Sequence, residues 1–361
     1  MIKSLYVHIP FCSHICGYCD FGKCRYEKPL ADRYLDHLEK ELSSIDQDSF
    51  FSIYIGGGTP TALDEVQLGR LLEMLARFKV EQEYTIEINP ENLTLEKAQL
   101  MKQFGINRAS IGLQTFDEGL LKVMGRVHSN KDVENTFEYL DKAGITNRSV
   151  DLMYGFQSQD LFDVLKDLNK AVQLNITHIS IYDLEVYPKT PFGLKNYQKV
   201  DDETDYLMYS TIIDFLNEHS YKQYEVSNFA LPHYQSAHNQ VYWKYEDYYG
   251  AGLSAAGKIG TYRYENTRNF VKYLKDEYRG EENYLSLDDV RFEALMMNLR
   301  LLEGIDIKEY DDRFETNLLL NKHDAIEKNI NHGLLKVENG HLKVTEKGIF
   351  VLNDIIVDFM D

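Results

Sequence analysis

The chain has 361 residues, of which 43% are hydrophobic and 27% charged, as in folded proteins, so wholesale disorder is excluded. This length suggests two domains, or one large domain with an appendage. Its 39 basic and 58 acidic residues give a formal net charge of −19. Such an acidic balance argues against broad binding to nucleic acids or anionic membranes, although it leaves room for a small basic pocket for an anionic ligand.

No apolar run approaches the roughly 20 residues that span a bilayer. The longest candidate, residues 349–360, is interrupted by Asn353, Asp354 and Asp358. The first residues, MIKSLYVHIPFC, lack the apolar stretch of a signal peptide. We therefore expect a cytoplasmic protein with no integral membrane segment and no nucleic-acid partner.

Up to about residue 230, short apolar runs typical of strands alternate with longer amphipathic stretches. The predicted strands are residues 4–9, 51–55, 84–88, 108–111, 149–153 and 178–184. Three helical stripes lie between them: Leu30, Tyr34, Leu35, Leu38 and Leu42; Leu68, Leu71, Leu72 and Leu75; and Leu161, Leu165, Leu168 and Val172.

Six strand-then-helix units in succession predict an α/β fold with a parallel sheet. Right-handed crossovers would close this sheet into a full or partial TIM-like barrel, here a partial (β/α)6 barrel. A doubly wound open sheet is the alternative, and periodicity alone does not separate the two.

The pattern changes after Pro232, where residues 234–262 are rich in Tyr, Trp, Gly and His. A helical pattern returns at residue 287, and two apolar runs around Asn339-Gly340 predict a hairpin. We therefore expect three parts. These are a barrel over residues 1–230, an aromatic-rich connecting segment over 231–285, and a small C-terminal α+β domain, winged-helix-like, over 286–361.

The four cysteines all lie within 13 residues, and Cys12, Cys16 and Cys19 follow the first strand with C-x3-C-x2-C spacing. Thiols packed this closely indicate a ligand set and not a disulfide framework. Three thiolates around one loop suit three corners of a [4Fe–4S] cube whose fourth iron stays open. A zinc site or a cluster closed by Cys24 is the alternative; we expect Cys24 to be an incidental thiol.

Polar side chains sit at the ends of the predicted strands. GGGTPT, residues 56–61, follows the second strand, and its simplest interpretation is a tight turn. Glu87, Gln114 and Asp151 lie at or within the next three strands, and Arg126 follows the helix after strand four. Because the carboxyl ends of barrel strands converge, these groups together suit the hydroxyls and carboxylate of a nucleoside ligand.

At this point the sequence resembles a known superfamily. CSHICGYC, preceded by LYVHIPF and followed by Asp20-Phe21, resembles the signature of the radical S-adenosylmethionine (SAM) proteins. It is most similar to the branch that contains oxygen-independent coproporphyrinogen III dehydrogenase and the HemW-type heme chaperones. There the open iron chelates the methionine part of SAM, and one electron cleaves SAM to methionine and a 5′-deoxyadenosyl radical. The resemblance implies a [4Fe–4S] cluster and SAM as cofactors and a reductant protein as partner.

The resemblance also assigns residues to SAM and leaves others structural. Its SAM-contacting positions fall on Tyr6, Tyr18, Gly57, Gly58, Thr59, Glu87, Gln114, Arg126 and Asp151. Glu185 departs from the pattern, because relatives carry a small or hydroxyl residue there, near the adenine. His8 and His128 are expected to be structural, and no residue is assigned a catalytic role.

A second motif, H-N-x-x-Y-W, spans residues 238–243. Histidine is a common axial ligand of heme iron, and Tyr and Trp stack on a macrocycle. The simpler interpretation is an aromatic loop packed between two domains. The motif resembles one associated with heme in HemW-type chaperones, so the resemblance predicts heme contacts by His238, Asn239, Tyr242 and Trp243. GAGLSAAG, residues 250–257, lacks the histidine that those chaperones often carry there.

Three hypotheses for function follow. The first is a chaperone that binds heme and hands it to an acceptor hemoprotein, with the cluster and SAM regulating heme binding or dimerisation. The second is an oxidoreductase that converts propionate side chains of coproporphyrinogen III to vinyl groups, and the third is a radical SAM enzyme with another substrate. The dehydrogenase usually has a further cysteine two residues after its third ligand, where this chain has Phe21, and a long amino-terminal extension, where eleven residues precede Cys12. We therefore favour the chaperone.

Overall fold

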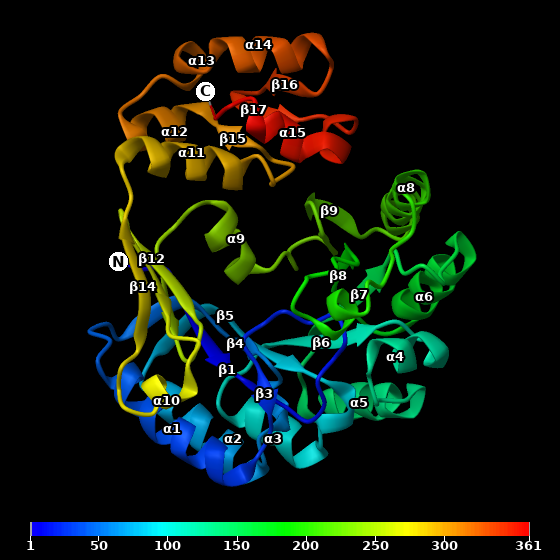
Figure 1. Cartoon of the computed structure of the whole chain (residues 1–361), viewed down its shortest axis with the longest axis vertical. Helices are drawn as coiled ribbons and strands as arrows, with labels where there is room; N and C mark the ends of the chain where they lie inside the picture. The colour runs from blue at the N-terminus through cyan, green and yellow to red at the C-terminus, as the bar shows by residue number, and fades with distance from the viewer. Residues whose placement is uncertain (1, 361) are drawn as a thin grey trace.

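The structure, a computed structural model that describes residues 2–360, is built on a twelve-stranded mixed sheet (Figure 1). The strand order is β14-β13-β12-β11-β1-β4-β5-β6-β7-β8-β10-β9. Six central strands are parallel: β1 (Ser4–Ile9), β4 (Ser49–Gly57), β5 (Lys79–Ile88), β6 (Arg108–Gln114), β7 (Asn147–Tyr154) and β8 (His178–Asp183). The flanking strands are β9 (Lys222–Glu225), β10 (Asn228–Ala230), β11 (Tyr248–Ala251), β12 (Ala256–Ile259), β13 (Tyr262–Asn266) and β14 (Arg279–Tyr284).

The central strands follow one another in chain order, without a reversal of direction along the sheet. A doubly wound sheet requires such a reversal, so this alternative is excluded. The sheet also does not close, because β1 pairs with β11 on its free side and β8 pairs with β10. The predicted partial barrel of six β/α units is therefore confirmed.

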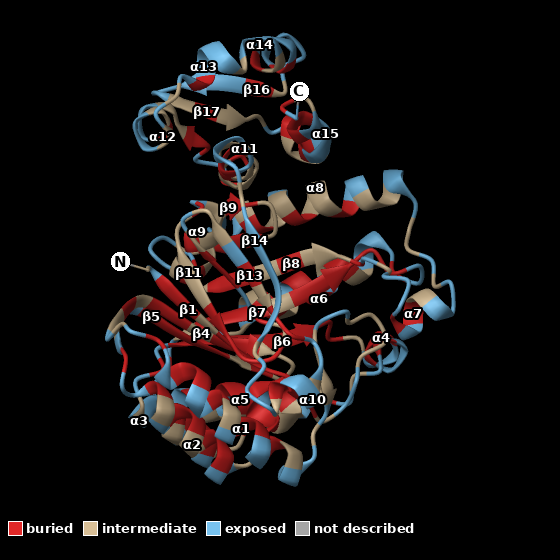
Figure 2. Ribbon diagram, turned by 60° about the vertical axis from the view of Figure 1, so that its left-hand side comes forward, coloured by how far each residue is buried: buried red, intermediate tan, exposed pale blue. Residues whose placement is uncertain are grey.

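Helices follow most of the central strands and cover the outer face of the sheet (Figures 1 and 2). All helices of this part of the chain, including α9, which does not lie on the outer face, are α1 (Lys28–Ser43), α2 (Glu65–Leu75), α3 (Leu95–Gln103), α4 (Glu118–Met124), α5 (Asn130–Ala143), α6 (Leu161–Gln173), α7 (Pro191–Leu194), α8 (Asp202–Glu218), α9 (Ala237–Trp243) and α10 (Phe270–Tyr273). Short 3-10 turns, η1 (Pro60–Ala62) and η2 (Pro90–Asn92), and a small pair, β2 (Phe11–Cys12) and β3 (Cys24–Arg25), complete it.

Local sequence explains where several of these helices begin. Asp64, Ser129 and Asp160 each accept a backbone N–H from the third residue of the helix that follows. The third residue returns the bond to the cap in all three cases, so two backbone donors are satisfied at each start. These caps fix the starts of α2, α5 and α6, which come after β4, α4 and β7 in the chain.

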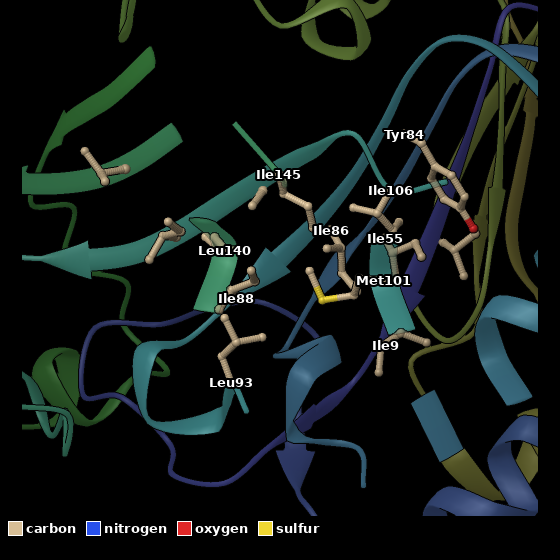
Figure 3. Close-up of a cluster of buried hydrophobic side chains, with 14 of the residues drawn as sticks. Ile9, Ile55, Tyr84, Ile86, Ile88, Leu93, Met101, Ile106, Leu140 and Ile145 are labelled. Carbon is tan, nitrogen blue, oxygen red and sulfur yellow. The ribbon is translucent and has the colours of Figure 1, made fainter. Parts of the chain in front are cut away.

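The main core lies between the sheet and the outer helices. Aliphatic side chains from the strands, such as Ile55 and Ile86, meet Met101 of α3 and Leu140 of α5, and all four are at most 1% exposed (Figure 3). Removal of this apolar surface from water is the dominant stabilising contribution to the fold. It also gives the carboxyl ends of the strands a rigid support.

The segment predicted as a connection, residues 231–285, takes part in the main sheet. β11 pairs parallel with β1, and β12, β13 and β14 extend the sheet as antiparallel strands beyond it. This segment therefore also supplies the lateral edge of the sheet.

The C-terminal unit has its own smaller core around Leu295, Ile305 and Leu342. Its elements are α11 (Leu287–Asn298), β15 (Ile305–Asp306), α12 (Ile307–Phe314), α13 (Leu318–Asn321), α14 (His323–Asn331), β16 (Leu335–Glu338), β17 (His341–Val344), η3 (Gly348–Val351) and α15 (Leu352–Val357). Asn339 and Gly340 join β16 to β17 with φ of 53° and 79°, the turn that the Asn-Gly pair favours, so the predicted hairpin is confirmed. Across residues 2–360, no helix combines the length and the apolar character needed to cross a bilayer.

Candidate functional site

A cavity of about 120 Å³ opens at the carboxyl ends of the central strands, beneath the cysteine loop. Of the twelve residues expected to hold the cluster and SAM, eleven line it, and Tyr6 does not. The eleven are Cys12, Cys16, Tyr18, Cys19, Gly57, Gly58, Thr59, Glu87, Gln114, Arg126 and Asp151. The structure thus brings side chains from six segments, up to 139 residues apart in the chain, to one place.

The cysteine loop is tied to the barrel at both ends. Cys24 N–H donates to Pro10 O at 2.7 Å, and Gly17 N–H donates to Met124 O at 2.8 Å. Cys12 is buried whereas Cys16 and Cys19 are half-buried. Cys24, in β3, pairs with Phe11 of β2 and is not among the residues that line the cavity.

The three cysteines lie around the cavity and do not converge on one point. Within residues 2–360, no three His, Cys, Asp or Glu side chains are gathered closely enough to hold a single metal ion. A [4Fe–4S] cube binds each thiolate through a different iron, so its ligands are spread around the cube. Three cysteines on the lining of one cavity fit three corners of such a cluster. Burial raises the pKa of the Cys12 thiol to about 12, so binding as a thiolate requires the positive charge of the metal.

A chain of polar contacts joins two of the cysteines across the cavity. Thr59 Oγ1 donates to Cys12 Sγ at 3.8 Å, and Asn89 Nδ2 donates to Thr59 Oγ1 at 2.8 Å. On the other side, Arg126 Nη2 donates to Asn89 Oδ1 at 3.1 Å, while its Nη1 lies 3.7 Å from Cys16 Sγ. Arg126 Nε is buried without a partner within the described chain, so it is a donor available to an anionic group such as a carboxylate.

Glu87 forms the floor of the cavity on β5. Its Oε1 accepts from the Tyr54 hydroxyl at 2.9 Å, and its Oε2 accepts from Gly57 N–H at 3.0 Å. Burial raises the pKa of the Glu87 carboxyl to about 7, although these two hydrogen bonds lower it, and the neighbouring Asp151 raises it further. The pKa of Asp151 is itself raised by burial. Two carboxyl groups poised in this way suit hydroxyl or cationic groups of a ligand.

Backbone geometry opens the cavity. Gly57 has a φ of 112°, and a Cβ on Gly58 would lie 2.8 Å from Phe11 O and 3.0 Å from Cys12 Sγ. Gln114 adopts a φ of 62°, uncommon for a residue with a side chain, at a register shift between β6 and β7. Gln114 lies at this bulge and is one of the residues that line the cavity. The glycines leave a backbone cradle that any side chain would fill.

Tyr6 lies behind the cavity. Its ring stacks on Tyr54, with centroids 6.1 Å apart, and its hydroxyl is 3.0 Å from His8 Nδ1. His8 Nε2 lies 2.6 Å from Gly22 O, and burial lowers the pKa of His8 to about 4. His8 therefore links the sheet to the cysteine loop as a neutral ring.

The structure places the H-N-x-x-Y-W motif on α9, where His238 is only 1% exposed. Its Nδ1 lies 2.9 Å from Ser52 Oγ, and its Nε2 lies 2.8 Å from Tyr242 Oη. Burial lowers the pKa of His238 to about 3. Neither ring nitrogen is free to reach an iron in this conformation, so heme ligation by His238 stays a prediction that requires one of these bonds to open.

The remainder of the motif is more accessible. Asn239 and Trp243 are half-buried, and Trp243 Nε1 is buried with no partner among residues 2–360. The guanidinium of Arg300 lies 6.0 Å from the Trp243 ring centroid, and Asn298 Nδ2 donates to Trp243 O at 2.7 Å. The motif therefore connects the barrel to the C-terminal unit.

Several lining residues were not found from the sequence, namely His14, Phe21, Lys23, Ile88, Asn89, Ser110, Gly112 and Tyr182. Asn89 and Tyr182 follow or end strands β5 and β8, so their place at a strand's carboxyl end was the available signal. Phe21 is 70% exposed beside the cysteines, and nothing in the sequence indicates that exposure.

Comparisons with known proteins show the family and the fold of the chain. The sequence profile of the radical SAM superfamily matches residues 6–171, and that of the HemN C-terminal domain matches residues 285–351. The chain is similar to the heme chaperone HemW of Lactococcus lactis, with 36% identity over 99% of this chain and 97% of that protein. It is also similar to HemW of Bacillus subtilis, with 34% identity over 99% of each. The solved structure of coproporphyrinogen III oxidase (HemN) from Escherichia coli matches with a TM-score of 0.87 and 22% identity, over 99% of this chain and 90% of that chain; this likeness shows the fold alone.

Proposed function

The chain belongs to the HemW family within the radical SAM superfamily, and from that membership we propose that it is a heme chaperone, which binds heme and delivers it to an acceptor hemoprotein. The observation that carries the proposal is similarity over nearly the whole length of both chains to proteins named for this activity. The radical SAM profile alone does not separate a chaperone from an enzyme, because one fold serves many functions.

The cavity supports the cofactor part of the proposal. Cys12, Cys16 and Cys19 would hold a [4Fe–4S] cluster, and Gly57, Gly58 and Thr59 would border the SAM amino group. The remaining assigned contacts to SAM would come from Tyr18, Glu87, Gln114, Arg126 and Asp151, with Tyr6 behind them. The cluster, when bound and reduced, supplies one electron for cleavage of SAM.

These residues act on the cofactors without forming bonds to the transferred heme. Arg126 keeps its charge at any accessible pH and presents its free Nε to a carboxylate. Glu87, held by Tyr54 and Gly57, is ionised above neutral pH and then attracts hydroxyl or amino groups. Occupancy of the cavity would regulate heme binding or dimerisation, with electrons supplied by a reductant protein.

An oxygen-independent coproporphyrinogen III dehydrogenase is the second candidate function. The fold does not distinguish the dehydrogenase from the chaperone, because the structural match to HemN extends over nearly the whole chain. The residues after the third cysteine, Asp20 and Phe21, favour the chaperone instead, since no further cysteine follows there. The two candidates differ in their products, so one experiment separates them.

The test uses the full chain, anaerobically reconstituted with iron and sulfide. Hemin is titrated while the Soret band is recorded, and the loaded protein is then mixed with an apo-hemoprotein. We expect saturable one-to-one uptake followed by transfer of the Soret signal to the acceptor. Release of carbon dioxide from coproporphyrinogen III in the presence of SAM and a reductant, without stable heme uptake, would instead establish the enzyme.

A further inference from the structure

A second and much larger cavity, of about 1360 Å³, lies between the barrel and the C-terminal unit. One wall comes from α8 and β9, and the other from residues 299–302, the β16–β17 hairpin and η3. The two walls are tied together at one side, where Leu302 N–H donates to Tyr224 O at 3.0 Å. The volume exceeds the roughly 300–1,000 Å³ typical of small-molecule sites, so it is sufficient for a ligand larger than most small molecules.

Part of the lining is apolar, and some of these apolar side chains are exposed. Tyr206 of α8 and Phe350 of η3 face each other across the junction with ring centroids 4.6 Å apart. Tyr206 is 51% exposed, and Leu302 and Val351 are each 37% exposed, although all three line the cavity. Exposed apolar surface inside a cavity marks a place where an apolar ligand is buried.

The charge of this cavity is opposite to that of the chain. Five basic residues and three acidic residues line it, in a chain whose net charge is −19. Lys222, Arg300, Lys343 and Lys347 form no ion pair with any residue between 2 and 360. Unpaired cations beside an apolar wall suit a ligand that carries carboxylates on an apolar body.

One lining residue is a histidine whose tautomer leaves a ring nitrogen free to bind a metal. His332, at the end of α14, is exposed, and its Nδ1 lies 2.7 Å from Lys328 O. A carbonyl only accepts, so Nδ1 carries the proton and the neutral ring keeps its lone pair on Nε2. Metal-bound histidines are commonly oriented by such a bond from the other ring nitrogen to a backbone carbonyl.

We propose that this cavity between α8 and the C-terminal unit is the heme site, with His332 Nε2 as an axial ligand of the iron and Lys343 as a partner of a propionate. The inference rests on the proposed function, since it names the place where that function's cargo is held. The bond formed is a donor bond from the Nε2 lone pair to the iron, and no electron or proton is transferred.

The site also gives the H-N-x-x-Y-W motif a connection to heme that requires no opening of His238. Arg300 lines the cavity and lies over the ring of Trp243. Heme bound here would lie beside Arg300, which is in contact with Trp243. The only tryptophan of the chain therefore serves as a fluorescent reporter close to the site.

The experiment titrates hemin into the full reconstituted chain and records the Soret band together with Trp243 fluorescence. We expect His332→Ala to weaken hemin binding at least tenfold and to shift the Soret maximum. The matched control is His323→Ala, because His323 is an exposed histidine on the same helix that does not line the cavity. A second pair compares Lys343→Glu with Lys308→Glu, an equal change of charge on exposed α12.

Lys343→Glu should weaken binding of hemin several-fold more than binding of its dimethyl ester, in which both propionates are neutral, whereas Lys308→Glu should weaken neither. Binding by the wild type that is unchanged in both His332→Ala and Lys343→Glu would overturn the site while the proposed function stands. Loss of binding in His238→Ala with full binding in His332→Ala would assign the iron to the motif instead. Absence of saturable hemin uptake by the wild type would overturn the proposed function itself.

Discussion

His238 packs its ring against Tyr54, with centroids 5.1 Å apart and a tilt of 31°, and Tyr54 in turn donates a hydrogen bond to Glu87. The aromatic motif on α9 thus supports the floor of the cysteine-lined cavity from behind. Glu83 adds to this support, because its buried carboxylate accepts from the backbone N–H groups of Ala237 and His238 at the start of α9. Tyr54 is therefore in contact with both the motif and Glu87.

Replacement of Tyr54 by Phe tests this relationship. The change removes only the hydroxyl that donates to Glu87, so it should raise the pKa of Glu87 and weaken SAM binding about tenfold, since a hydrogen bond to a charged group contributes about 1.5–3 kcal/mol. Equilibrium dialysis of SAM against the reconstituted protein measures the effect. Tyr84→Phe is the matched control, because the buried Tyr84 hydroxyl has no partner within residues 2–360. Equal losses in both variants would contradict the role of Tyr54.

A second test distinguishes the role of Cys16 from that of Cys24. Cys16→Ala should abolish the absorbance of a [4Fe–4S] cluster and reduce bound iron and sulfide, because it removes one of the three proposed ligands, all of which border the cavity. Cys24→Ala should retain both, since Cys24 lies in β3 outside the lining residues. Iron and sulfide analysis after reconstitution measures this directly. Full cluster content in Cys16→Ala would overturn the ligand assignment.

The fold was predictable because its six central strands contain dense apolar runs. Five of the six predicted ranges lie within the observed strands, and the sixth, 178–184, runs one residue past the end of β8. The predicted first strand, residues 4–9, coincides with β1. The strand predicted at 84–88 begins in fact at Lys79, because residues 79–82, which are mostly exposed, and the buried Glu83 extend β5 alongside β4. Pattern analysis does not detect this start, because three of these five residues are charged and their place in the strand is set by backbone pairing.

The positions of site residues were predictable where the residues lie at strand ends. They were less predictable where tertiary packing sets the orientation of an element. Gly57, Glu87 and Asp151 needed only the convergence of parallel strands. The orientation of α9 could not be inferred, because seven residues contain two turns, and the buried face is chosen by Ser52 and Tyr54 of β4, more than 180 residues earlier in the chain. The large cavity could not be predicted either, because tertiary packing brings its walls together from two parts of the chain that share no motif.

The pH dependence of stability gives a third test, and its direction follows from the raised pKa of Glu87. Its folded pKa of about 7 lies above the ordinary value of 4.5, so the folded state holds the proton more tightly than the unfolded state. The stability of the cofactor-free protein should therefore decline as pH rises from about 4.5 to 7, by up to about 3 kcal/mol from this group. Glu87→Gln removes this loss, so the variant should be more stable than the wild type at pH 8, with the difference shrinking toward pH 5. Urea unfolding at the two pH values measures it, and a difference that does not depend on pH would contradict the buried carboxyl.

The same carboxylate should make SAM binding depend on pH in the opposite direction. Deprotonation of Glu87 supplies the negative charge that faces the ligand, so SAM affinity should increase as pH rises through about 7 and the increase should be absent in Glu87→Gln. Dialysis of SAM between pH 6 and 8 measures the profile. A wild-type profile that Glu87→Gln reproduces would assign the pH dependence to another group.

Gly57 provides the last test, which separates backbone strain from lack of space. Gly57→Ala would force a side chain into a positive φ of 112° and bring its Cβ into contact with the His8 ring, which links the sheet to the cysteine loop. Gly105→Ala carries similar strain at a φ of 89°, but its Cβ would meet no atom within 4 Å. Both variants should lose about 1–2 kcal/mol of stability from the backbone. Only Gly57→Ala should also lose SAM binding and cluster content, because displacement of His8 moves the loop that carries the cysteines. Retention of SAM binding in Gly57→Ala would show that the cradle tolerates a side chain and that Gly57 is required by the turn alone.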